Sequence, residues 1–413
     1  MHTHLPLIND WQLNAGRDSS VNIVLIHRRT FRFQTKFTIA VYGNDQGANN
    51  VLDAVAGAAH AHDDIDVVRF PGLNTAIPDD LHDRLQESCA AVLGISTGMP
   101  EARIAAQALR KNPALAGKIF FVQDFPGSSG IHDPVLRSIG KDARLCSILL
   151  LPQEAAERAV YRSVHAVGVP DHWFFALKAI REGMRLRSAG KISKRRQGTG
   201  EEVAIDARDL VVYVSGSKDP VREARLLRHL RELKSIDGRP VLFHFRAHPS
   251  ERNLLFLREA IRERDALLDG QWQMVMPEEE GDACADAWLI GASDIAIVHP
   301  GSTSVILASA LRKKLIGFDE GMPSSGGGGS SFGYVQTTRL THHVRRVSDI
   351  ELALSALSRE QSKESVGLRE RQERYALTIE KGGSYGKNVL VVVRRFICDE
   401  AMRQDDTRNA RIT

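Results

Sequence analysis

The stretch Ser293-Asp-Ile-Ala-Ile-Val-His-Pro-Gly-Ser-Thr-Ser-Val-Ile-Leu-Ala-Ser-Ala-Leu311 decides the fold class of this chain. Its apolar first part predicts a buried strand, the Pro-Gly-Ser centre predicts a turn, and the small aliphatic residues that follow predict a helix. A helix that begins on such a turn offers backbone N–H groups, hydroxyls and its positive dipole end, which favour phosphate or carboxylate anions. The candidate phosphate-binding residues here are Gly301, Ser302, Thr303 and Ser304.

The run Val241-Leu-Phe-His-Phe-Arg-Ala-His-Pro249 predicts a second strand, which ends in cationic and polar residues. Parallel sheets bind their ligands at the edge where the carboxyl ends of the strands meet. Arg246 would add charge there, and His248 in the His248-Pro249 pair would hydrogen-bond a phosphate or leaving-group oxygen. His299 precedes another proline and competes with His248 for this role. Together the two strand ends indicate a site for a nucleotide diphosphate.

Short apolar strands alternate with helical segments in two series along the chain. The strands of the first series are predicted at 37–42, 65–70, 90–95, 118–123, 147–151 and 164–168. Those of the second series are predicted at 210–214, 240–245, 272–276, 294–298 and 314–318. Such alternation predicts an α/β fold with two Rossmann-like, doubly wound parallel-sheet domains that face a cleft.

Composition sets the expected domain limits. Residues 1–35 are an N-terminal extension, and 36–180 form a first domain that would hold the acceptor. Residues 181–207, rich in Arg, Lys, Gly and Ser, are the expected linker. Residues 208–385 form a second domain for the nucleotide donor, and 386–413 contain a last helix.

Composition also limits the class of protein. The chain has 413 residues, 43% hydrophobic and 26% charged, which fits a globular protein of two domains. A formal net charge of +4 is too weak over this length to indicate nucleic-acid binding. The four cysteines show no CxxC spacing, which favours a reducing cytoplasm and disfavours a zinc site. No apolar run reaches the roughly 20 residues of a membrane span, and the N-terminus lacks the pattern of a signal peptide.

Other strand ends carry further candidates. The turn after the first strand of the second domain consists of Ser215, Gly216 and Ser217. It either approaches a phosphate with its backbone or is an ordinary turn. In the first domain, Asp45 or Asp124 is the candidate general base, and capping or chain reversal explains both positions as well. Glu278 opens an acidic loop that either takes ribose hydroxyls or is simply solvated. The hydroxyls after His299 would also serve as a plain helix cap.

Taken together, the residues from about 36 to 402 resemble the GT-B superfamily, and the most specific pieces are Arg246-Ala-His-Pro249 and Ser293 to Val305. This group includes nucleotide-sugar glycosyltransferases, CDP-glycerol glycerophosphotransferases, bacterial sialyltransferases and UDP-N-acetylglucosamine 2-epimerases. The resemblance implies that the His-Pro histidine and the later Ser/Thr residues bind the phosphates of the donor. It also implies catalysis without a bound metal and a last helix that crosses back to the first domain.

The chain departs from individual members of that group. The epimerases carry acidic residues after the equivalent serine, whereas this chain has Thr303-Ser-Val-Ile-Leu-Ala308. The CDP-glycerol glycerophosphotransferases, which act in teichoic-acid synthesis, show an Asp-Tyr-Ser-Ser type of turn. This chain has His299-Pro-Gly-Ser302 in its place. The sialyltransferases use an acidic pair before a glycine as base, and here only Asn44-Asp-Gln-Gly47 stands near that place.

From this resemblance we expect a cytoplasmic, metal-independent glycosyltransferase of bacterial surface-polysaccharide synthesis. It would move a sugar or related group from a nucleotide-activated donor to an acceptor hydroxyl, with no cofactor besides the donor. Two alternatives stay open: a sugar-nucleotide 2-epimerase, and a GT-B-like binding or assembly protein without catalysis. Neither donor nor acceptor follows from the sequence, and a homo-oligomer is compatible with it.

Overall fold

The computed structural model describes these residues, with a few isolated positions between them: 37–43, 46–71, 81–95, 118–123, 146–149, 164–166, 171–217, 219–248, 255–277, 284–299, 303–320, 339–375 and 385–409. Met1–Thr35 is a unit separate from Lys36–Thr413 and lies outside these residues. Residues 150–163 and 321–338 also lie outside them.

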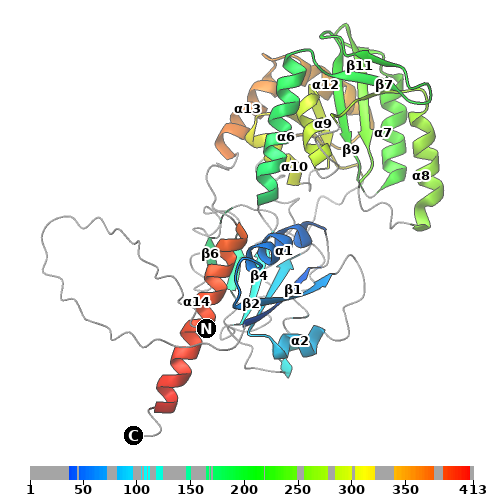
Figure 1. Cartoon of the computed structure of the whole chain (residues 1–413). Helices are drawn as coiled ribbons and strands as arrows, with labels where there is room; N and C mark the ends of the chain where they lie inside the picture. Colours follow the sequence, from blue (N-terminus) through cyan, green and yellow to red (C-terminus); the bar gives the residue numbers. More distant parts are fainter. Residues whose placement is uncertain are drawn as a thin grey trace, which may run out of the picture. The chain divides into compact units, whose positions relative to one another are not determined.

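The first sheet has six parallel strands in the order β2-β1-β3-β4-β5-β6 (Figure 1). Their bounds are β1 Phe37–Gly43, β2 Ile65–Pro71, β3 Ala90–Ile95, β4 Ile119–Gln123, β5 Cys146–Leu149 and β6 Val164–Ala166. Helix α1 (Gln46–Ala59) packs with Ile39 and Val41, whereas α2 (Leu81–Glu87) packs with Ala40 and Tyr42. Because neighbouring residues of β1 are buried on opposite faces, both faces of this sheet are covered.

The second sheet also has six strands, in the order β10-β11-β9-β13-β14-β15. Their bounds are β9 Leu210–Ser215, β10 Ser235–Ile236, β11 Arg239–Arg246, β13 Ile295–Val298, β14 Lys314–Phe318 and β15 His342–Val344. All are parallel except β10, which forms a hairpin with β11. The sequence predicts β9, β11, β13 and β14, and misses the short strands β10 and β15 at the two edges.

Helices cover both faces of the second sheet. Val212 and Val214 of β9 share a core with α7 (Pro220–Glu232) and α12 (Ile350–Ser358). Val211 and Tyr213 instead share one with α9 (Ala285–Ala292) and α10 (Thr303–Ala310). The remaining helices are α8 Arg258–Asp265 and α13 Lys363–Tyr375, with 3-10 turns η3 Leu255–Leu257, η4 Ala266–Leu268 and η7 Val347–Asp349. This two-sided cover is the doubly wound α/β architecture that the sequence predicts.

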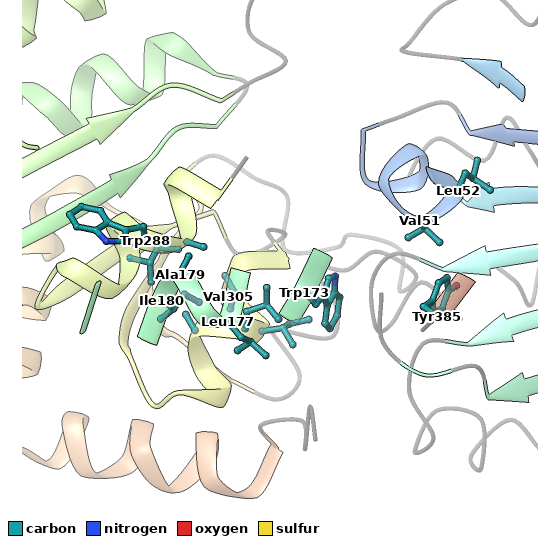
Figure 2. Close-up of a cluster of buried hydrophobic side chains, with 14 of the residues drawn as sticks. Val51, Leu52, Trp173, Leu177, Ala179, Ile180, Trp288, Val305 and Tyr385 are labelled. Atoms are coloured by element: carbon teal, nitrogen blue, oxygen red, sulfur yellow. The ribbon is translucent and has the colours of Figure 1, made fainter. Parts of the chain in front are cut away.

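Two helices pack away from the strands that precede them. Helix α6 (Asp171–Ser188) follows the first series but packs on α9, where Figure 2 shows Ile180 near Trp288. Arg187 near its end forms an ion pair with Asp294, at 2.9 Å. Helix α14 (Tyr385–Asn409) ends the chain but packs on α1, and Arg394 pairs with Asp64 at 2.7 Å. The chain therefore passes from one α/β unit to the other at both helices.

The segment 181–207, where composition predicts a linker, contains regular structure. Its first part continues α6, and the rest holds the hairpin β7 (Ser193–Arg196) and β8 (Glu202–Ala204). Strand β12 (Trp272–Met274) pairs antiparallel with β7, so the strand predicted at 272–276 belongs to a separate three-stranded sheet. Lys194 and Arg196 lie 5.5 and 6.0 Å from the Trp272 ring, and these cation–π contacts stabilise the pairing.

Candidate functional site

The order of the strands creates a crevice in the second sheet. From β9 the chain moves outward through α7 to β11, and later returns to the other side of β9 to form β13. The loops after β9 and β13 therefore leave the sheet in opposite directions. Open α/β sheets bind ligands at such a switch point, beyond the carboxyl ends of the strands. The stretch quoted at the outset thus lies at the preferred place for a ligand.

A small hollow lies at this switch point. Its walls come from β9, α7, β13 and the end of β14: Val214, Ser215, Ser217, Arg222, Glu223, Leu226, Ile297, Val298, His299 and Phe318. Two predicted serines and His299 thus line one hollow, together with an arginine that the sequence reading did not select. Arg246 and His248 are not among its described lining residues.

Arg222 is the most unusual member of this hollow. It lies in the first turn of α7, and its side chain is 4% exposed. Its backbone N–H donates to the N-cap Asp219, at 3.1 Å. Among the residues that the structure describes, the guanidinium has neither an ion pair nor a hydrogen bond. Burying a charged group that has no partner among the described residues is costly, and an anion in the hollow would relieve this cost.

A buried carboxylate, that of Glu223, accepts hydrogen bonds from the loop after β9. Glu223 Oε1 accepts from the backbone N–H of Ser217 and, at 2.9 Å, from its hydroxyl. Glu223 Oε2 pairs with Arg264 at 2.7 Å, and both side chains are buried. Burial raises the pKa of Glu223, while the hydrogen bonds from Arg264 and Ser217 lower it. Because the Ser217 hydroxyl donates to Glu223, its proton is not available to a phosphate.

Close backbone contact joins the loops after β9 and β11. Ser215 and Arg246 are register partners, and the Gly216 N–H donates to the Arg246 carbonyl at 2.7 Å. A Cβ atom on Gly216 would lie 2.5 Å from the His248 nitrogen, so only glycine fits without a shift. The structure thus brings Ser215, Gly216, Arg246 and His248 together. The Arg246 guanidinium forms an ion pair with Asp286, at 2.9 Å.

The other predicted site residues have different outcomes. Thr303 and Ser304 lie in the first turn of α10, directly after the loop that follows β13. Six further candidates lie outside the described residues: Asp45, Asp124, Pro249, Glu278, Gly301 and Ser302. Their roles stay predictions.

Sequence reasoning missed Arg222, Glu223 and Asp286. Each lies in the first turn of a helix, where a charged residue reads as a capping or dipole effect. A usable signal existed for Arg222, because it stands with Leu226 and Leu230 on the apolar side of α7.

A larger hollow, of about 680 Å³, lies beside the edge strand β15 and α12. It is open, and its charges are partly satisfied from within: Arg346 pairs with Asp349 at 2.9 Å, and Arg345 donates to His343 at 3.2 Å. It lies at the sheet edge rather than at the switch point. We therefore place the candidate site at the smaller hollow.

Solved structures with a similar α/β fold are known. The UDP-N-acetylglucosamine 2-epimerase from Rickettsia bellii matches with a TM-score of 0.51 at 12% identity, over 88% of this chain and 97% of that chain. The chain has the GT-B fold. A glycosyltransferase from Rickettsia africae also matches, with a TM-score of 0.46 at 11% identity, over 88% of this chain and 99% of that chain.

MurG from Acinetobacter baumannii matches with a TM-score of 0.47 at 8% identity, over 87% of this chain and 99% of that chain. No protein-family model and no curated protein matches the sequence. At sequence identities this low, structural similarity supports an inference about the fold but not about the reaction. Among the helices that the structure describes, none is long and apolar enough to span a bilayer.

Proposed function

We propose that the chain is a glycosyltransferase that moves a sugar, or a related group, from a nucleotide-activated donor to an acceptor hydroxyl. The observation that carries this proposal is Arg222, a buried cation with no partner among the described residues, in the switch-point hollow of a GT-B fold. A phosphate of the donor would be its counter-ion, and Ser215 and His299 line the same hollow. These groups would bind the donor from the second sheet.

The reaction needs charge stabilisation and a base. The acceptor oxygen forms a bond to the anomeric carbon, the bond from that carbon to the donor phosphate breaks, and the nucleotide leaves with the electron pair. Arg222, Arg246, His248 and the start of α10 would stabilise the negative charge on the leaving phosphate without a metal or another cofactor. A carboxylate of the first domain would take the proton of the acceptor hydroxyl.

Sheet order favours one of the two candidate bases. In the first sheet, β2 and β3 lie on opposite sides of β1, so the switch point lies between β1 and β3. Asp45 follows the end of β1 at Gly43 and precedes α1, whereas Asp124 follows β4. We therefore propose Asp45 as the base. Synthesis of a bacterial surface polysaccharide, which the sequence resemblance implies, would supply the acceptor.

A test of the reaction uses a panel of UDP-, CDP-, GDP- and CMP-sugars, with and without mixed sugar acceptors, read by mass spectrometry. We expect transfer or slow donor hydrolysis, and strong losses in His248→Ala and Ser302→Ala. An Arg228→Met variant, which changes an exposed residue on the same helix as Arg222, serves as the control. Unchanged turnover in both site variants would contradict the assignment of these residues.

The likeness to the Rickettsia bellii structure, titled as an epimerase, keeps a second candidate in view. An epimerase needs no acceptor, so a changed sugar configuration after incubation with UDP-N-acetylglucosamine alone would favour it. Nucleotide binding without any turnover would instead favour a GT-B-like binding protein. The acceptor-dependent arm of the panel separates the transferase from both.

A further inference from the structure

One carboxylate oxygen joins two strands and a helix beside the candidate site. Asp286 lies in the first turn of α9, and its Oδ1 accepts from the Tyr213 hydroxyl at 2.8 Å. The same oxygen pairs with the Arg246 Nε at 2.9 Å. Tyr213 belongs to β9 and Arg246 is the last residue of β11, so the contact spans neighbouring strand ends. Such an arrangement fixes the direction of the arginine side chain.

The Tyr213 hydroxyl is a permanent donor in this group. Its side chain is fully buried, and burial raises the pKa of the phenol well above its usual range, with the Asp286 charge acting in the same direction. The neighbouring His244 ring lies 6.2 Å from the Tyr213 ring, and burial and Arg246 lower the pKa of His244 to about 4. Burial therefore favours the neutral forms of Tyr213 and His244 beside the Arg246–Asp286 ion pair.

Arg246 and Arg222 consequently differ in their electrostatics. Arg222 has no ion pair among the described residues, and the Glu223 carboxylate in the same hollow pairs with Arg264 instead. Arg246 is about a quarter exposed, with 27% of its side chain accessible, and Asp286 offsets much of its charge. The printed contact with Asp286 is made through Nε, the guanidinium nitrogen nearest the main chain. Arg246 would thus contribute orientation more than net attraction.

We propose that Asp286 is a positioning residue, which holds Arg246 at the end of β11 in the orientation that binds a donor phosphate, and that Tyr213 holds Asp286. The identity of the ligand in this inference rests on the proposed function, whereas the positioning of Arg246 by Asp286 is independent of it. In this proposal Asp286 acts on the donor through its ion pair with Arg246.

A double-mutant cycle tests this path. Using the nucleotide that binds the wild-type chain, calorimetry would give the dissociation constants of Asp286→Ala, Arg246→Met and the double variant. We expect Asp286→Ala to weaken binding about tenfold and to have no further effect once Arg246 is Met. Asp286→Asn, which keeps an oxygen acceptor, should lose less than Asp286→Ala. Equal effects of Asp286→Ala in both backgrounds, or none in either, would overturn the proposal.

A second measurement does not depend on the nucleotide. The Arg246 Nε–H, identified in NMR spectra of isotope-labelled full-length chain by its loss in Arg246→Met, should exchange slowly in the wild type and quickly in Asp286→Ala. Glu263→Ala on the exposed face of α8 serves as the control. Fast exchange in the wild type would refute the positioning. Slow exchange without binding of any nucleotide would instead refute the proposed function and the ligand part of this inference.

Discussion

Arg222 and His244 show how burial acts on single residues of the second sheet. Arg222 is 4% exposed and has no partner among the described residues. His244 avoids charge: its Nδ1 accepts the Met274 N–H at 3.0 Å, which requires that nitrogen to be unprotonated. Buried charges without partners lower stability, and residues that bind ligands often carry such a cost.

The first prediction concerns the stability cost of Arg222. Arg222→Met removes a buried charge and keeps most of the apolar stem. We expect the free energy of unfolding, measured in urea without ligand, to stay unchanged or to rise by about 1–2 kcal/mol. A fall of about 3 kcal/mol or more, as when a buried ion pair is broken, would show that Arg222 has a structural partner instead.

The second prediction concerns His244 and pH. Its folded-state pKa is about 4, against 6.5 for the ordinary histidine, so the unfolded chain binds the proton first as pH falls. The contribution of His244 to stability is therefore complete above about pH 6.5 and is lost toward pH 4, by up to about 3 kcal/mol. His244→Asn keeps an acceptor for the Met274 N–H and does not titrate.

Urea unfolding of both proteins between pH 4 and 7 checks this expectation. The wild-type curve should fall more steeply with decreasing pH than the His244→Asn curve, and the two slopes should agree above pH 6.5. Parallel curves throughout the range would mean that His244 titrates normally in the folded chain.

Glycines set the distance between helices α6 and α9. A Cβ atom on Gly291 would lie 2.1 Å from the Ile180 carbonyl oxygen, and one on Gly183 would lie 2.4 Å from the Trp288 carbonyl oxygen. Each helix thus presents a glycine to the backbone of the other. This contact fixes α6 against the second sheet although the helix follows the first series of strands.

The third prediction is that Gly291→Ala destabilises the chain. The added methyl meets backbone rather than a flexible side chain, so the helices must separate and lose packing, at a cost of about 2–4 kcal/mol. Gly57 of α1 is the control, because an added Cβ there meets nothing within 4 Å. Gly57→Ala should leave stability unchanged or raise it by up to about 1 kcal/mol. Thermal unfolding of both variants measures the difference, and equal melting temperatures would contradict the close approach.

At the level of elements, the sequence predicts what depends on local patterns. The buried strands β1, β3, β9 and β13 are continuous apolar runs, and turn residues bound them clearly. The sequence predicts a linker at the hairpin β7–β8 because its residues are mostly polar. The hairpin is stabilised by pairing with β12, which lies far away in the chain. Edge strand β15 is short and contains two histidines, so periodicity does not reveal it.

In the candidate site, too, local patterns predict some residues, and contacts between distant residues determine the others. Residues at strand ends, such as Ser215, Arg246 and His299, are predictable because parallel sheets gather these ends at one edge. The contacts of Asp286 with Tyr213 and Arg246 join residues more than thirty positions apart, and no local pattern encodes them. Arg222 resembles an ordinary residue of an amphipathic helix until the structure shows that it is buried and has no partner among the described residues.

The whole molecule repeats one design. In each six-stranded sheet the chain forms a first strand, moves to one side, and then returns to the other side of that strand. Each sheet therefore has its own switch point, between β1 and β3 in the first and between β9 and β13 in the second. Helix α6 packs on α9 beside the second sheet, and α14, red in Figure 1, packs on α1 beside the first. This design agrees with a donor on one sheet and an acceptor on the other.

The most direct test of the central claim is calorimetric titration of UDP, CDP, GDP and CMP into the wild-type chain, Arg222→Met and Arg228→Met. The claim is that a donor phosphate binds in the switch-point hollow against Arg222. It predicts that one of these nucleotides binds the wild-type and Arg228→Met chains equally, and binds Arg222→Met at least about tenfold more weakly. Absence of binding for all four, or equal affinity for Arg222→Met and the wild type, would contradict it.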